Sequence, residues 1–141
     1  HIDDLKLDEN IPYVDIKPHS WRSLKTKGSQ RQVPLVGASL WAAQRIKANA
    51  SSCFAFPRYT DNNRCNANSA SNALNKWLQA NFRKDIVIHG FRHAMRDRLR
   101  AVSCPSEMID QIGGWSSGKV GEGYGEGFRK VALRNALNEA L

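Results

Sequence analysis

The sequence predicts a mostly α-helical α+β domain, in which a small antiparallel β-sheet near the N-terminus packs on a bundle of helices. Two patterns support this fold class. In the first third of the chain, apolar and polar side chains alternate, as they do in half-buried strands. From Ala38 onward, apolar side chains recur every three or four positions, as they do on a helix with one buried face. The length of 141 residues fits one domain.

The first expected strand is Ile11–Ile16, because its apolar and polar residues alternate. The segments Trp21–Thr26 and Arg31–Leu35 flank a polar turn, so we expect them to pair with each other as a hairpin. Pro34 lacks an amide hydrogen, and it therefore either ends the pairing or marks an edge of the sheet.

Helices are expected for most of the remaining chain, with a loop at Ser51–Asn66. The expected helices are a segment from Ala38 to Ala50, then Ser69–Phe82, His89–Val102, a short helix that begins near Ser103 and ends at Gly113, and Phe128–Leu141. The residues expected on their inner faces are Leu40, Ala43 and Ile46; Leu74, Trp77, Leu78 and Phe82; Phe91, Met95, Leu99 and Val102; Met108, Ile109 and Ile112; Leu133, Leu137 and Leu141.

The charge of the chain is its strongest bulk property. The formal net charge is +8 and the isoelectric point is near 9.8, a balance that attracts polyanions and nucleic acid above all. No apolar run approaches the roughly 18 residues that a membrane span needs, and no signal-peptide pattern is present. The three cysteines are far apart and form no CxxC pair, which is typical of thiols in a reducing cytoplasm.

The stretch 89-HGFRH-93 has the residue types of a phosphate site. His89 and Arg92 are three positions apart and share a face of a helix, where a guanidinium fork and the amides of a helix N-terminus can bind an anion. His89 and His93 also have the spacing of two zinc ligands. However, Gly90 replaces the glutamate of HExxH and no acidic third ligand is near, so we expect no metal. For His93 alone, we favour an inward ring that satisfies a backbone carbonyl.

Two other stretches carry candidate residues. In 25-KTKGSQRQVPL-35, a lysine at the hairpin tip can reach a DNA phosphate or give a proton to a leaving oxygen, although an exposed basic hairpin is the plainer alternative. The segment 111–130 holds seven glycines around Trp115 and Tyr124. These glycines spell neither GxGxxG nor GxxxxGK[ST], so they predict no nucleotide cofactor.

Four motifs occur in one order: KTxxSxRxVPL, then HxxRH, then a glycine followed by an aromatic residue, then a tyrosine nine positions later. In this order and spacing they resemble the tyrosine recombinase (phage integrase) family. The resemblance covers the family's catalytic domain from about Tyr13 onward, and residues 1–141 are expected to be that domain, truncated at its N-terminus.

The resemblance implies a role for each matching residue. Tyr124 falls at the nucleophile, which attacks a DNA phosphodiester and forms a 3′-phosphotyrosine link. Arg92 falls at the second catalytic arginine, which binds the scissile phosphate, and His89 falls at the His or Lys that accompanies it. Trp115 takes a position that is usually His and sometimes Trp, and its indole N–H can donate to a phosphate oxygen.

The hairpin lysine implied as the general acid is Lys25, with Lys27 as the alternative because hairpin lengths vary in the family. Further DNA contacts are expected from Lys27, Arg31, His93 and Lys119. The implied partner is double-stranded DNA, with a homotetramer on DNA in the full-length protein and a cytoplasmic location. The last helix is expected to dock on a neighbouring subunit. Neither metal nor ATP is implied, because one phosphate ester is exchanged for another.

The sequence departs from the family at two places. No arginine occurs in Ile2–Lys17, and the family's first catalytic arginine lies upstream of the first strand, so the chain alone is expected to hold an incomplete active site. Gly113 stands where an apolar side chain is usual. Two alternative functions remain, a DNA-binding domain with decayed catalysis and a DNA-relaxing enzyme similar to type IB topoisomerases.

Overall fold

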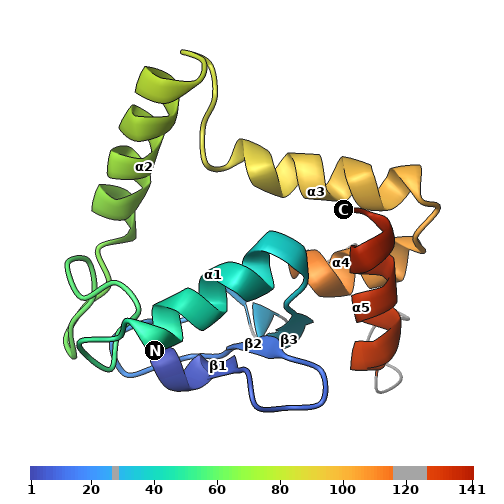
Figure 1. Cartoon of the computed structure of the whole chain (residues 1–141), viewed down its shortest axis with the longest axis horizontal. Helices are drawn as coiled ribbons and strands as arrows, with labels where there is room; N and C mark the ends of the chain where they lie inside the picture. Colours follow the sequence, from blue (N-terminus) through green and yellow to red (C-terminus); the bar gives the residue numbers. More distant parts are fainter. Residues whose placement is uncertain (27–28, 116–126) are drawn as a thin grey trace.

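The computed structural model describes residues 1–26, 29–115 and 127–141. Along the chain, the elements are η1 (Ile2–Asp4), β1 (Leu5–Lys6), β2 (Tyr13–Ile16), β3 (Arg31–Pro34), α1 (Gly37–Ala48), α2 (Ala67–Asn81), α3 (Gly90–Ala101), α4 (Ser106–Gly113) and α5 (Lys130–Glu139). A small sheet near the N-terminus and a predominance of helix confirm the expected α+β class (Figure 1).

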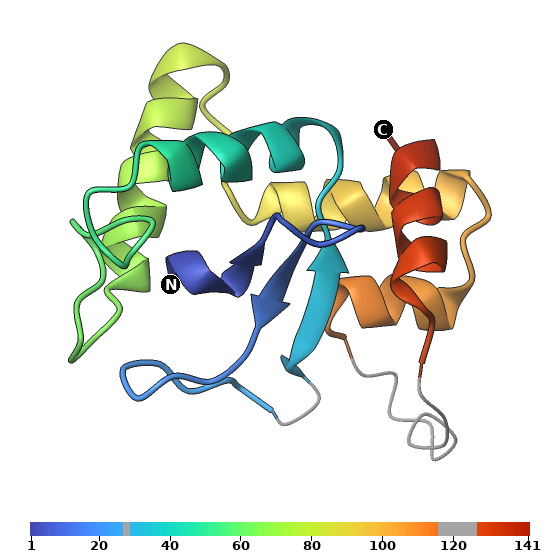
Figure 2. The same ribbon diagram turned by 60° about the horizontal axis from the view of Figure 1, so that its bottom comes forward.

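The three strands form an antiparallel sheet in the order β1-β2-β3. β3 pairs with β2, from Tyr13 opposite Pro34 to Ile16 opposite Arg31. Figure 2 shows the strands side by side, with α4 and α5 beyond the β3 edge. Pro34 is the last residue of this edge strand, so its missing amide hydrogen costs the sheet nothing, as expected.

The predicted hairpin between Trp21–Thr26 and Arg31–Leu35 is wrong. Residues 21–26 form no strand, and the short bridge in this region joins His19 to Arg22. The side chains explain why. The Trp21 ring stacks on the His19 ring, with centroids 4.7 Å apart, and the Arg22 guanidinium donates to the carbonyl of Lys17. These local contacts close a loop, and the alternating β2 strand pairs with β3 instead.

The main core lies where α3, α4 and α5 meet the end of β3. Its buried members are Val36, Leu99, Met108, Ile109, Ile112, Leu133, Leu137 and Ala140. The most deeply buried side chains are Leu99 and Leu133, at 0% and 1% exposure. The inner faces predicted for the short helix and for most of the last helix are therefore confirmed. Leu141 is the exception, because α5 ends at Glu139 and Leu141 is exposed.

α5 packs into the core of its own chain, through Leu133 and Leu137. This packing goes against the expectation that the last helix docks on a neighbouring subunit, because the apolar stripe that would dock is already covered. The exposed residues Val131 and Leu141 lie outside that buried stripe.

The inner face predicted for α2 is largely exposed. Leu78 is buried, but Leu74, Trp77 and Phe82 are 47%, 56% and 65% exposed. Phe91, predicted on the inner face of α3, is also exposed. Figure 1 shows α2 standing apart from α3, α4 and α5. A 3.6-residue period identifies residues that share a face, but it does not say whether another element covers that face.

Candidate functional site

The site residues predicted from sequence come from three parts of the fold. Lys25 is exposed in the loop between β2 and β3, His89 is the N-cap of α3, and Arg92 and His93 lie in the first turn of that helix. Trp115 follows the end of α4. Three further predicted site residues, Lys27, Lys119 and Tyr124, lie outside the described residues.

At the start of α3, the rings of His89 and His93 meet edge to face with centroids 5.0 Å apart. Both residues are exposed, so the interpretation of His93 as an inward residue is wrong. The i, i+4 spacing puts both rings on the same solvent-facing side of the helix. In residues 1–26, 29–115 and 127–141, no three His, Cys, Asp or Glu side chains gather as metal ligands.

Among the described site residues, Arg92 and Trp115 are in direct contact. The guanidinium carbon of Arg92 lies 4.1 Å from the centroid of the Trp115 ring, well within the range of a cation–π interaction. Both residues are half-buried. No carboxylate of the described residues forms an ion pair with Arg92. An arginine that is partly removed from water and has no such neighbour is suited to bind an external anion.

A second arginine shares the same ring. The guanidinium carbon of Arg96, one turn along α3, lies 5.0 Å from the Trp115 centroid. Arg96 also faces the carboxylate of Asp110, with Nη2 3.7 Å from Oδ1, and the backbone carbonyl of Asp110 accepts a hydrogen bond of 3.0 Å from the Trp115 amide. Asp110 therefore ties both Trp115 and Arg96 to α4.

The two glycines before Trp115 make this arrangement sterically possible. Gly114 ends α4 in the left-handed region, at φ 64°, which a residue with a Cβ adopts at a cost. A Cβ on Gly113 would overlap the six-membered ring of Trp115. The apolar side chain that the family resemblance leads one to expect at position 113 is thus replaced by the ring of Trp115 itself.

Arg31 occupies the space beside Gly114, where a Cβ would come within 2.6 Å of the guanidinium carbon. Its Nε donates to the carbonyl of Ile112 at 3.0 Å and its Nη1 to the carbonyl of Ser29 at 2.7 Å. Burial lowers the pKa of Arg31, and the nearby positive charge of Arg92 lowers it further. The sequence suggested Arg31 only as a DNA contact, which stays a prediction. Sequence reasoning missed that Arg31 joins β3 to α4. The adjacent glycines Gly113 and Gly114 were the signal that could have indicated a close approach there.

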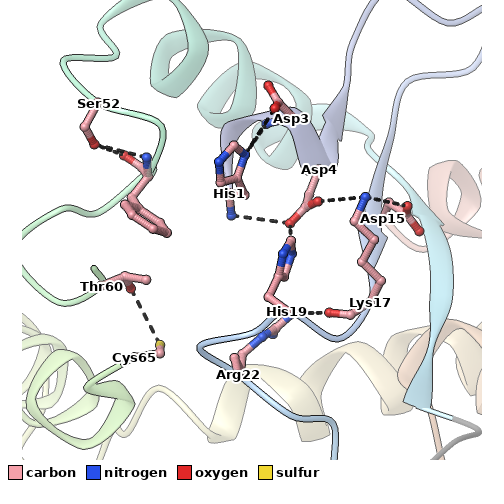
Figure 3. Close-up of polar contacts among 11 residues, drawn as sticks. His1, Asp3, Asp4, Asp15, Lys17, His19, Arg22, Ser52, Thr60 and Cys65 are labelled. Atoms are coloured by element: carbon pink, nitrogen blue, oxygen red, sulfur yellow. Dashed lines mark hydrogen bonds and ion pairs between the residues drawn. The ribbon is translucent and has the colours of Figure 1, made fainter. Parts of the chain in front are cut away.

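The loop that carries Lys25 is anchored at its base by Asp4, a buried carboxylate (Figure 3). Asp4 Oδ2 lies 2.7 Å from Nε2 of His19, and Oδ1 lies 3.2 Å from Nζ of Lys17. Burial by itself would raise the pKa of Asp4, but the contacts with His19 and Lys17 outweigh it and hold the pKa below its usual value. Within the described part of the chain, no hydrogen bond or cation–π interaction joins Lys25 to Arg92 or Trp115.

The described residues resume at Gly127, and this segment also lies beside α4. The Gln111 side chain makes two hydrogen bonds with the backbone of Phe128: Nε2 donates to its carbonyl at 3.1 Å, and its amide donates to Oε1 at 2.8 Å. Gly127 has φ 69°, and a Cβ there would lie 3.0 Å from Oε1 of Gln111. Helix α4 therefore holds both Trp115 and Phe128, which flank the stretch that contains Tyr124.

No described helix combines the length and the apolar character that a membrane crossing needs. Comparisons with curated proteins and with solved structures found no match. The model of the Phage integrase family matches residues 1–126, which is most of the chain and includes every predicted catalytic residue. This match supports a site-specific recombinase or integrase type of function and DNA as the partner. The chain belongs to the Phage integrase family.

Proposed function

We propose that this chain is the catalytic domain of a tyrosine-type site-specific DNA recombinase, with Tyr124 as the nucleophile. The observation that carries the proposal is the half-buried Arg92, which lies on the Trp115 ring and has no carboxylate partner among the described residues. It lies in the first turn of α3, where the helix dipole adds to the attraction for a phosphate.

The proposed reaction exchanges one phosphate ester for another. The phenol oxygen of Tyr124 attacks the scissile phosphorus and gives up its proton to His89 or to water, the P–O5′ bond breaks, and the 5′ oxygen takes a proton from Lys25 or Lys27. The DNA is left with a 3′-phosphotyrosine link and a 5′ hydroxyl, which can attack in turn to rejoin a strand. Because the number of phosphate esters is unchanged, the exchange needs no ATP.

The remaining residues serve the transition state. A phenol with a pKa near 10 is a weak nucleophile, and negative charge gathers on the phosphoryl oxygens during the attack. Arg92 and His89 supply positive charge or donors at the start of α3, and the indole N–H of Trp115 supplies a neutral donor. Losing one such donor typically lowers the rate by about a hundred- to a thousand-fold.

The assembly and the location belong to the same proposal. In the full-length protein, we expect four copies to act on DNA in the cytoplasm. Because the apolar stripe of α5 packs within its own chain, we expect other surfaces to join those copies.

The test is covalent capture on nicked suicide substrates, in which the released fragment cannot rejoin. We expect a protein–DNA adduct through a 3′ phosphate, formed by the chain and by the Tyr59→Phe control but not by Tyr124→Phe. The chain should be joined to an upstream segment that supplies an arginine, because Ile2–Lys17 contains none.

Two results would replace this proposal with an alternative. DNA binding without an adduct would indicate a DNA-binding domain with decayed catalysis. Relaxation of supercoiled plasmid without site preference, by a chain that does form the adduct, would indicate an enzyme similar to type IB topoisomerases.

A further inference from the structure

We infer that Gly113 and Trp115 form one positioning unit for Arg92: the bare Cα of Gly113 seats the Trp115 ring, and the ring orients the Arg92 guanidinium toward a DNA phosphate. The inference rests on the proposed function, since it assigns the anion to the DNA backbone. It gives Gly113 a role of its own and gives Trp115 a role separate from hydrogen-bond donation.

The first step of the argument is steric. A Cβ at position 113 would overlap three carbons of the six-membered ring of Trp115, so the ring lies directly on the glycine. Gly113 is buried and is the last residue of α4, a helix whose other inward residues belong to the main core. A rigid helix end therefore supports one face of the indole.

The second step concerns the arginines. The guanidinium carbons of Arg92 and Arg96 lie 4.1 and 5.0 Å from the ring centroid, so a single indole attracts two cations one helical turn apart. Arg96 is further held by Asp110, and its buried Nε has no hydrogen-bond partner among the described residues. No described carboxylate holds Arg92, so the ring is the main feature that fixes its guanidinium.

The third step is electrostatic. The charge of Arg92 is felt at Arg31, which is itself engaged with the carbonyl of Ile112 beside Gly114. Like charges held near each other repel, and an anion between or beside them relieves that repulsion. The indole holds the Arg92 guanidinium in place against this repulsion before the phosphate binds. Such preorganisation increases the affinity for the DNA phosphate.

The test separates the contribution of the aromatic face to DNA affinity from the contribution of the indole N–H. In a Tyr124→Phe background, which removes the covalent step, binding of a short DNA duplex is measured by fluorescence anisotropy at fixed salt. Trp115→Phe keeps an aromatic face without an N–H, and Trp115→Leu keeps apolar bulk without either. We expect the Leu variant to bind about three- to thirty-fold more weakly than the Phe variant. Equal affinities of the two variants would overturn the inference.

A double-mutant cycle tests the seat. Gly113→Ala should weaken DNA binding by a similar factor when Trp115 is present. The same substitution should change the affinity less than about twofold in a Trp115→His background, because the smaller ring leaves room for the methyl group. Gly90→Ala is the matched glycine control, since a Cβ there meets no atom within 4 Å. Equal fold-changes in both backgrounds, with melting temperatures preserved, would contradict the proposed seat.

The results of the two DNA-binding experiments do not depend on whether the chain forms a covalent adduct. If the chain never forms a covalent adduct but the two binding experiments behave as expected, the proposed reaction fails and the positioning unit stands. If the adduct forms while the Phe and Leu variants bind equally, the positioning unit fails and the reaction stands.

Discussion

Replacing Gly114 with alanine should destabilise the fold through two separable effects. The first is backbone strain, because Gly114 has φ 64° and a non-glycine residue in the left-handed region costs about 1–2 kcal/mol. The second is steric. The new methyl group would come within 2.6 Å of the guanidinium carbon of Arg31, so that side chain must move.

The steric part can be estimated from the bonds that Arg31 makes. The tip of a long side chain moves more easily than the backbone, so the main cost is the 3.0 Å hydrogen bond from Nε to the carbonyl of Ile112. A hydrogen bond that involves a charged group contributes about 1.5–3 kcal/mol. Together the two effects predict a loss of about 2.5–5 kcal/mol in the free energy of unfolding for Gly114→Ala.

Urea unfolding of four variants measures both effects, with m-values compared to confirm that the transitions are equivalent. In an Arg31→Ala background, Gly114→Ala should cost only the backbone part, about 1–2 kcal/mol. Gly90→Ala, which adds a methyl group in open space at the start of α3, should leave stability unchanged or raise it by up to about 1 kcal/mol. A loss below 1 kcal/mol for Gly114→Ala, or an equal loss in both Arg31 backgrounds, would refute the reasoning.

Three further predictions concern stability and DNA binding. Asp4→Asn should lower the free energy of unfolding by about 2–3 kcal/mol at pH 7, as measured by urea titration. The control Asp8→Asn breaks the exposed ion pair with Lys47 and should lower it by less than about 1 kcal/mol. Because the folded-state pKa of Asp4 is lowered, its contribution is present above the unfolded pKa near 4 and is lost as the pH falls through the folded value, so the Asp4→Asn difference should vanish in acid. Leu99→Ala should cost about 2–5 kcal/mol and Leu74→Ala less than about 1, because Leu99 is 0% and Leu74 is 47% exposed. Arg92→Lys should weaken binding of a DNA duplex, as measured by fluorescence anisotropy. An ammonium group lacks the planar guanidinium that both stacks on an indole and forms two hydrogen bonds to a phosphate.

The last two helices show what local patterns can predict. The inward positions Met108, Ile109 and Ile112 of α4 and Leu133 of α5 were all readable from their spacing, because each face meets the core along its whole length. On α2 the same reasoning failed at Trp77. The spacing was right, but no described element covers that face.

The strand pairing failed for a related reason. Alternation identified β2 as a strand and the polar turn identified β3, but the choice of partner depended on contacts that neither pattern encodes. The segment after β2 forms a local loop through contacts among Lys17, His19 and Arg22. Because that segment forms no strand, β3 pairs with β2.

By itself, the sequence determined the fold class, the basic character and the order of motifs that places this chain among the phage integrases, because these depend on residue type and spacing. Only the tertiary structure decided what the glycine pair is for. Gly113 seats Trp115 and Gly114 makes room for Arg31, whose hydrogen bond to Ile112 joins residues 81 positions apart. Spacing along a chain describes the neighbours within one helix or strand, whereas this site is made of contacts between elements distant in sequence, and those form only when the core brings β3, α3 and α4 together.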